Sequence, residues 1–140
     1  MIKEFKLQNK IILLTGSEGN LGKFLVNELK KYKTKLILID VYKKKIKKNK
    51  KIDYYSCDFN DKEQLNNLIS LLKKKYKRID IIINNAALTT NIKSKKKSFV
   101  IDNFEESLRV NLDSAYKICM ALRRNLNNGV NPCILNVSSM

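Results

Sequence analysis

The sequence predicts a doubly wound α/β fold, in which helices cover both faces of a parallel β-sheet. Short, unbroken runs of Ile, Leu and Val recur along the chain, as expected of strands that are buried on both faces. Longer segments with apolar residues at helical spacing lie between these runs. This alternation is typical of β-α-β units, whose parallel strands are joined by right-handed crossovers.

Five apolar runs are the expected strands, and no linker-like composition separates them. A chain of 140 residues has the usual size of one domain. We therefore expect residues 1–140 to form a single domain. The expected strands span residues 10–15, 35–39, 52–57, 80–84 and 133–137.

Three segments have the apolar periodicity of helices, and a core-facing stripe can be assigned to each. Asn60 and Asp102, each followed three residues later by Glu, are the expected N-caps of the second and third helices. Gly129 and Pro132 are expected to end the last helix. The stripes are Leu21, Phe24, Leu25 and Leu29 in residues 21–32; Leu65, Leu68, Ile69 and Leu72 in 65–76; and Leu108, Leu112, Ala115, Ile118, Cys119 and Leu122 in 104–126.

The composition excludes several kinds of site. No apolar run approaches the roughly 18 residues of a membrane span, and the polar N-terminus does not resemble a signal peptide. We therefore expect a cytoplasmic protein with no membrane partner. The sequence has no histidine, and its three cysteines form no C-x-x-C pair, so no metal site is expected.

The net charge of +16 is the other conspicuous property of the composition. Only four of the 29 basic residues are Arg, whereas proteins that read bases and phosphates favour Arg. We interpret the excess Lys as an AT-rich coding bias at solvent-facing positions, which makes nucleic acid an unlikely partner. The alternative is some affinity for polyanions.

Three of the four glycines stand in the stretch TGSEGNLG, between the first expected strand and the first expected helix. In this context Gly16 allows a sharp turn, Gly19 leaves space for a pyrophosphate, and Gly22 allows close packing of the helix against the sheet. The amides that begin the helix, with the helix dipole behind them, would face the phosphates. The candidate dinucleotide-binding residues of this turn are Gly16, Ser17, Glu18, Gly19, Asn20, Leu21 and Gly22.

Asp40 ends the second expected strand, where a carboxylate accepts hydrogen bonds from an adenosine ribose. Because a carboxylate there repels a 2′-phosphate, NAD is favoured over NADP. Lys43 and Lys44 weaken this preference, since nearby ammonium groups tolerate the phosphate. The alternative interpretation of Asp40 is a residue that opens a turn.

Five separated segments resemble the short-chain dehydrogenase/reductase family: TGSEGNLG at 15–22, CDF at 57–59, NNAA at 84–87, VNLDS at 110–114 and NVSS at 136–139. The resemblance implies a Rossmann-like sheet of about five strands in the order 3-2-1-4-5, with a bound NAD. It implies that Asp58 and Phe59 contact the adenine edge. It also implies that Asn84, Asn85 and Ala86 line the cofactor site and stabilise the sheet.

The same resemblance implies catalytic roles near the end of the chain. Asn111 would hold a water in a proton relay, although it could instead be a buried Asn bonded to neighbouring backbone. Ser139 would hydrogen-bond the oxygen of a small-molecule substrate, with Ser138 as the second choice. The two serines could otherwise be part of an ordinary turn.

Two features depart from the family pattern. The glycine spacing T-G-x-x-G-x-x-G is typical of the extended branch, which includes sugar-nucleotide epimerases and dehydratases, whereas the other segments resemble the shorter reductases. The family's catalytic Y-x-x-x-K, expected about a dozen residues beyond Ser139, is not found within the 140 residues. We therefore expect a domain truncated after the fifth strand that binds cofactor with little or no turnover.

Three alternatives or additions follow from these observations. The chain could be a non-catalytic dinucleotide-binding module, or a basic protein associated with nucleic acid. The segment 104–126 resembles one half of the family's usual dimer interface, so a homo-oligomer is expected to form through it.

Overall fold

The computed structural model describes residues 6–42, 49–88 and 103–138. Its centre is a five-stranded parallel sheet in the order β3-β2-β1-β4-β5, which confirms the predicted fold class and strand order. Each observed strand shares one end with the predicted strand and differs from it by one residue at the other end. The strands are β1 (Ile11–Thr15), β2 (Lys35–Asp40), β3 (Ile52–Ser56), β4 (Ile81–Asn84) and β5 (Cys133–Asn136).

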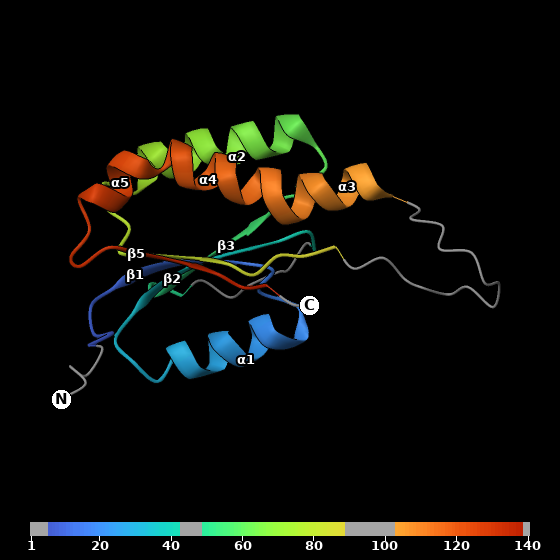
Figure 1. Ribbon diagram of the computed structural model, residues 1–140. Coiled ribbons are helices and arrows are strands. Elements are labelled where there is room, and N and C mark those ends of the chain that lie inside the picture. Colours follow the sequence, from blue (N-terminus) through green and yellow to red (C-terminus); the bar gives the residue numbers. More distant parts are fainter. Residues whose placement is uncertain (1–5, 43–48, 89–102, 139–140) are drawn as a thin grey trace.

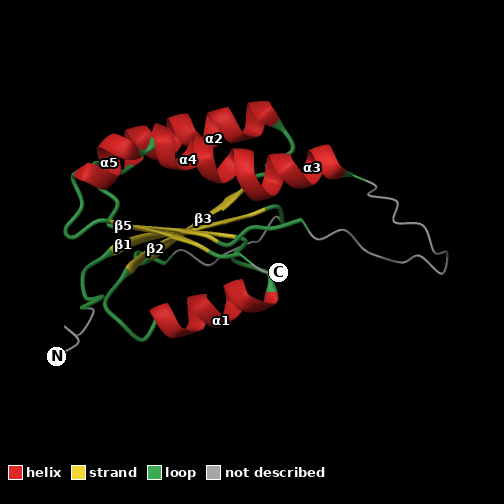
Figure 2. Cartoon of the chain, in the orientation of Figure 1, coloured by secondary structure: helices red, strands yellow, loops and turns green. Residues whose placement is uncertain are grey.

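Helices cover the two faces of the sheet unequally (Figure 1). One helix, α1 (Asn20–Leu29), lies on one face, and the others lie on the opposite face. Figure 2 shows the same three layers, coloured by secondary structure. The second helical layer consists of α2 (Lys62–Lys75), α3 (Phe104–Leu108), the π-helical turn η1 (Arg109–Asp113), α4 (Ser114–Ala121) and α5 (Arg123–Asn127).

The central strands are buried on both faces, which explains their unbroken apolar sequences. In β1, Leu13 belongs to the core under α2 and α4, while Ile12 and Leu14 belong to the core under α1. Successive side chains of a strand point to opposite faces, so one continuous apolar run supplies both cores. By contrast β5 is largely exposed, with Ile134 and Leu135 each more than 40% accessible.

The predicted core stripe is confirmed for α2 and shifted for α1. In α2 the residues Leu65, Leu68, Ile69 and Leu72 are all buried. In α1, Leu21 and Phe24 are exposed, and the buried residues are Gly22, Val26 and Leu29. The stripe centres on Gly22 because that residue must lie against the preceding turn.

The predicted single helix 104–126 is interrupted twice. The wide turn η1 separates α3 from α4, and Leu122, with φ −91° and ψ 8°, separates α4 from α5. A π turn holds one residue more than an α turn, so the faces before and after it are out of register. Leu108 and Leu112 are therefore exposed, contrary to prediction, whereas Ile118 and Leu122 are buried as predicted.

The N-cap predicted at Asn60 is wrong by one residue. Asp61 caps α2, and its Oδ1 accepts hydrogen bonds from the N–H groups of Glu63 and Gln64. The helix α3 begins after Asn103, a left-handed residue without a side-chain cap. Asp102, the N-cap predicted for the third helix, lies outside the described residues.

Polar side chains link neighbouring segments at the amino edge of the sheet, the edge at which the strands begin. The fully buried Asp80 accepts hydrogen bonds from Ile11 N at 2.7 Å and Val130 N at 2.6 Å. Arg78 Nε lies 3.5 Å from the same carboxylate. Asp80 therefore ties β1, β4 and the segment before β5 together at one point.

A second polar cluster joins β3 to the end of α2. Asp53 pairs with Lys35 at 2.9 Å and Lys75 at 3.2 Å, and it accepts a hydrogen bond from Tyr76 Oη. Burial alone would raise the pKa of Asp53, but the hydrogen bonds from Tyr76, Lys35 and Lys75 hold that pKa below its usual value. Burial, together with the Asp53 contact, raises the pKa of Tyr76, so the phenol stays neutral and donates.

In the described part of the chain, no helix combines the length and the apolar character that crossing a bilayer would require.

Candidate cofactor-binding site

A cleft of about 700 Å³ opens at the edge where the strands end, the carboxyl edge. Parallel strands bring their carboxyl ends together, so residues distant in sequence meet there. The wall is formed by the turn after β1, the ends of β2 and β3, the segment after β4, and one residue of η1. The lining residues are Gly16, Gly19, Asn20, Leu21, Gly22, Asp40, Val41, Tyr42, Cys57, Asp58, Phe59, Asn60, Asn85, Ala86, Ala87, Leu88 and Val110.

Two of the three glycines in the first turn are required by the fold itself. Gly16 has φ +66°, and a Cβ on it would lie 2.7 Å from the Cα of Ala86. A Cβ on Gly22 would lie 2.0 Å from the carbonyl oxygen of Gly16. Gly22 thus permits close contact between α1 and the turn before it, rather than with the sheet in general as predicted.

Gly19 is different, because the fold does not require a glycine there. Its φ of −67° is open to any residue, and its Cβ would meet nothing closer than the Gly16 oxygen at 3.5 Å. Gly19 is the N-cap of α1 and offers no side-chain cap to the first N–H groups of the helix, which lack partners within it. A side chain here would fill the concave surface in which those groups can receive an anion.

The segment after β4 is fastened to the end of β1. Thr15 Oγ1 accepts hydrogen bonds from the N–H groups of Asn85 and Ala86, each at 3.0 Å. Asn85 Nδ2 donates to the carbonyl oxygens of Thr15 and Gly16 at 3.1 and 3.0 Å. Sequence reasoning missed this supporting role of Thr15, although its position directly before Gly16 is a usable signal.

Asp40 is buried at the end of β2 and holds the glycine turn in place. Its Oδ2 accepts a hydrogen bond from Glu18 N at 2.8 Å, and its Oδ1 accepts one from Tyr42 N at 3.3 Å. Burial, with the charges of Asp40 and Glu18, raises the pKa of the nearby Tyr54 to about 12. The neutral Tyr54 phenol donates to Tyr42 O at 2.8 Å, which fixes the backbone beside the carboxylate.

The residues after β3 form the part of the cleft wall beside Asp40, since Cys57 N donates to Asp40 O at 2.9 Å. Asp58 Oδ1 accepts a hydrogen bond from Asn60 N at 2.9 Å, and Phe59 belongs to both the cleft wall and the core. Burial, followed by the charges of Asp58 and Asp61, raises the pKa of the Cys57 thiol to about 12. Cys57 is therefore protonated at neutral pH and is no nucleophile.

Three predicted cofactor residues lie behind the wall rather than on it. Ser17 is almost fully buried, and Glu18 contributes a backbone N–H to Asp40. Asn84 is buried between β4 and β5, where its Nδ2 donates to Asn136 Oδ1 at 2.8 Å and approaches Cys119 Sγ at 3.4 Å. The position of Asn84 suits the sheet-stabilising part of its expected role.

The predicted catalytic residues are only partly described. Asn111 lies in η1, and its side chain accepts from Leu88 N at 2.7 Å and donates to Leu88 O at 3.2 Å. Bonds to backbone are what the alternative interpretation of Asn111 expects, although Asn111 is exposed rather than buried. Ser138 is exposed just beyond β5, and Ser139 lies outside the described residues.

Seven wall residues were not predicted: Val41, Tyr42, Cys57, Asn60, Ala87, Leu88 and Val110. Six of them lie just beyond the end of β2, β3 or β4, and adjacency at the carboxyl edge is a signal that could have found them. Val110 depends on the path of η1, for which the sequence offers no comparable signal.

The parallel sheet of order 3-2-1-4-5, with a glycine-rich turn at its first crossover, is the arrangement of a Rossmann-type fold. The family model for short chain dehydrogenase matches residues 10–140, so the chain belongs to the short-chain dehydrogenase family.

Relatives and solved structures agree with this assignment. The chain is 34% identical over 120 residues to "Uncharacterized oxidoreductase TDA5" of Saccharomyces cerevisiae, covering 84% of this chain and 33% of that protein. It is 24% identical over 146 residues to 3-oxoacyl-[acyl-carrier-protein] reductase FabG of Thermotoga maritima, covering 96% and 57%. A short chain dehydrogenase from Leptospira borgpetersenii with bound NAD⁺ has the same fold, with a TM-score of 0.79 at 23% identity, covering 99% of this chain and 56% of that one. The chain thus spans a third to somewhat over half of the length of these proteins.

Proposed function

We propose that this chain binds NAD in the carboxyl-edge cleft, as the cofactor-binding part of an oxidoreductase acting on a secondary alcohol or carbonyl of a small molecule. The observation that carries the proposal is Gly19, a glycine that the fold does not need and that a bound diphosphate would need. The short-chain dehydrogenase from Leptospira borgpetersenii that shares this fold is described with bound NAD⁺, which supports the choice of cofactor.

The described residues suit the parts of the cofactor. The N–H groups near Asn20 and Leu21 would hold the diphosphate, and Asp40 would accept hydrogen bonds from the adenosine ribose. Asp58 and Phe59 would border the adenine. The nicotinamide, when bound, accepts or supplies a hydride.

For turnover, we propose roles for Asn111 and for Ser139 or Ser138, in holding a water and the substrate oxygen. None of the six tyrosines within the 140 residues has a Lys four positions later. We therefore propose that the isolated chain binds cofactor with little or no turnover. A non-catalytic dinucleotide-binding module is the alternative, and the glycine spacing keeps an extended-branch relative as a further one.

Substitution of Gly19 by Ala tests the cofactor proposal. The fold accepts a Cβ there, so the melting temperature of Gly19→Ala should match that of the parent chain, while its affinity for NAD falls at least about tenfold. Calorimetric titration measures the affinity, and NAD at about 100 times its dissociation constant should stabilise the parent by about 2.7 kcal/mol. Unchanged NAD binding by Gly19→Ala would remove the proposed diphosphate position.

We also propose that the chain self-associates through the segment 104–126. Large apolar side chains recur there every four residues and are each more than 40% exposed: Phe104, Leu108, Leu112, Tyr116 and Met120. This spacing places them along one side of the helical segment. Analytical ultracentrifugation should find a dimer or larger assembly at micromolar concentration, and Leu112→Lys should dissociate it. A parent chain that sediments as a monomer would contradict this proposal.

A further inference from the structure

The amino edge of the sheet, opposite the cleft, carries most of the described positive charge. The segments that bound this edge are residues 6–10, 28–35, 49–53, 73–80 and 122–132. Together they hold fifteen Lys and Arg residues and three acids. The lysines within 43–48 and 89–102 lie outside the described residues and are not counted.

Each of the three acids of the amino edge pairs with a basic residue of the same edge, so the acids leave the other basic residues of this edge unneutralised. Glu28 pairs with Lys31, Asp53 with Lys35 and Lys75, and Asp80 with Arg78. Ten other basic residues of this edge are exposed, and the described part of the chain offers none of them an ion pair. They are Lys6, Lys30, Lys33, Lys50, Lys51, Lys73, Lys74, Lys77, Arg123 and Arg124.

These charges stand on backbone that is held in place, unlike an isolated run of lysines. Asn9 N donates to Lys33 O at 2.7 Å, and Arg78 Nη2 donates to Asn9 O at 3.0 Å. Asn128 Nδ2 donates to Lys77 O at 3.1 Å. Hydrogen bonds therefore link the segments before β1, β2, β4 and β5 into one surface, which we call the amino-edge platform.

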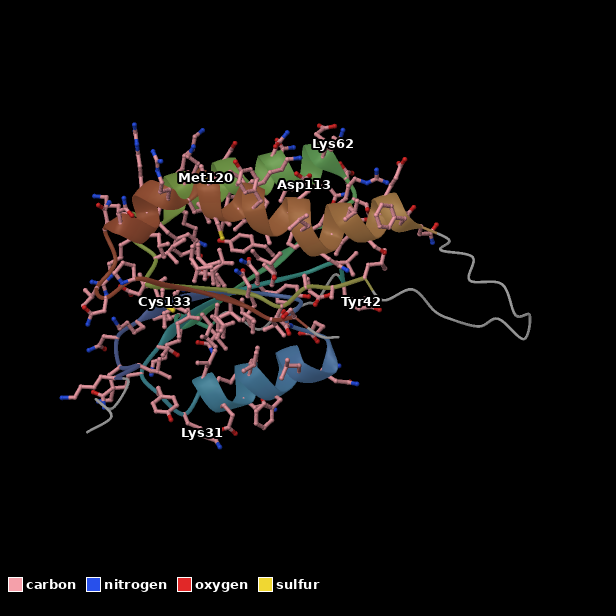
Figure 3. The ribbon with its side chains drawn as sticks, viewed as in Figure 1. Lys31, Tyr42, Lys62, Asp113, Met120 and Cys133 are labelled. Carbon is pink, nitrogen blue, oxygen red and sulfur yellow. The ribbon has the colours of Figure 1, made fainter. Side chains whose placement is uncertain are left out.

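The two ends of the described molecule differ in charge. At the carboxyl edge, residues 15–23, 39–42, 56–63, 84–88, 103–110 and 136–138 hold seven acids and three basic residues. Figure 3 shows nitrogen-tipped side chains projecting at the end of the molecule marked by Lys31 and Cys133, whereas Tyr42 lies at the other end. The described residues therefore concentrate positive charge at the amino edge, at the end opposite the cleft.

We propose that the amino-edge platform docks on the anionic surface of a lipid bilayer, a peripheral contact that departs from the sequence-based expectation of no membrane partner. Two apolar side chains stand among its charges, Tyr32 and Val130, which are 46% and 52% exposed. Such residues suit the interfacial region of a bilayer, where aromatic rings and long cationic side chains gather. The charges spread over a whole end of the molecule and are mostly Lys. A planar, delocalised partner fits them better than a nucleic acid, which is read by Arg forks in a groove.

Sedimentation with lipid vesicles tests this proposal on the full chain without NAD, so its outcome is independent of the cofactor proposal. We expect binding to phosphatidylcholine vesicles that contain phosphatidylserine, little binding to phosphatidylcholine alone, and release by high salt. The double substitution Lys33→Glu and Lys77→Glu should weaken vesicle binding at least about 25-fold, since each Lys near an anionic surface contributes about 1 kcal/mol, a factor of about five.

A matched control changes the net charge equally at the other edge. Lys23→Glu with Lys62→Glu alters two exposed residues near the cleft and should retain most of the vesicle binding. Circular dichroism verifies that each variant folds. If the charge-reversed variant does not fold, the double substitution Lys33→Gln and Lys77→Gln replaces it and should cause an intermediate loss of vesicle binding. Equal losses in both double variants, or binding to neutral vesicles, would overturn the proposal. Tighter binding to duplex DNA than to acidic vesicles at the same salt concentration would also overturn it.

Discussion

The amino and carboxyl edges of this sheet use polar residues in opposite ways. At the amino edge, Asp80 and Asn125 satisfy backbone groups of neighbouring segments. At the carboxyl edge, Gly19 leaves the first turn of α1 without a side-chain cap beside an open cleft. One edge therefore stabilises the fold, and the other keeps backbone groups available for a ligand.

The largest expected effect is a loss of stability at the amino edge, and it distinguishes the roles of the two edges most directly. Replacing Asp80 by Ala leaves the N–H groups of Ile11 and Val130 without an acceptor, at a cost of about 1–3 kcal/mol each. We expect the free energy of unfolding, measured with urea, to fall by about 4 kcal/mol. Asp80→Asn keeps one acceptor and should lose about half as much. NAD affinity of the folded protein should be unchanged, and a variant that lost affinity but kept its stability would contradict this division of roles.

A pair of glycines offers the next comparison. Gly22→Ala forces a Cβ against Gly16 O, and Gly129→Ala forces one to within 2.6 Å of Ile79 O. Overpacking of this kind costs about 2 kcal/mol, so both variants should unfold at lower urea concentration. Only Gly22→Ala should also weaken NAD binding in calorimetry. Equal affinities in the two variants would show that the glycine turn does not contact the cofactor.

A smaller effect is expected from removing one charge at the carboxyl edge. Asp40→Asn keeps an oxygen to accept from Glu18 N but no longer repels a 2′-phosphate. The ratio of NAD to NADP affinity should fall about tenfold, equivalent to about 1.4 kcal/mol. Titration with both cofactors measures this ratio, and a constant ratio would remove the selectivity role of Asp40.

The smallest expected effect concerns Asp53 and depends on pH. Its pKa in the folded protein lies below that of the unfolded chain. The ionised carboxylate therefore contributes stability above the unfolded pKa of about 3.9, and this contribution is lost as the pH falls through the folded pKa. Asp53→Asn should lower the free energy of unfolding by about 1 kcal/mol at pH 7. In urea titrations below about pH 4, the free energies of unfolding of the parent and of Asp53→Asn should converge. A difference that stays constant with pH would contradict the stabilising role of the Asp53 carboxylate.

The fold could be predicted because burial on both faces leaves a strong pattern in the sequence. Continuous Ile and Leu runs marked the central strands β1, β2 and β4, and strict periodicity marked the buried face of α2. No sequence pattern of this kind indicated the shift of the α1 stripe or the exposure of Leu108. The first depends on Gly22 lying against a turn, and the second on a π turn whose extra residue changes the register.

The site was predictable where backbone geometry restricts the residue type. Gly16 needs positive φ, and Asp40 ends a buried strand, so both stood out in the sequence. Asn84 and Ser17 were placed on the cofactor by their position in motifs, yet tertiary packing buries both behind the wall. Contacts such as Asn111 to Leu88 join segments more than 20 residues apart, and local patterns do not encode them.

The position of β1 at the centre of the sheet has a consequence for how the chain folds. Only α1 separates β1 from its neighbour β2 along the chain, whereas α1, β2, β3 and α2 all separate β1 from its other neighbour, β4. Parallel pairing over such a sequence distance requires costly loop closure and slows folding. During synthesis, the first three strands and α1 can assemble early, while the open side of β1 waits for the ribosome to deliver its partner. Until then a fully apolar strand edge is exposed, which is the interval in which a chaperone would be most useful.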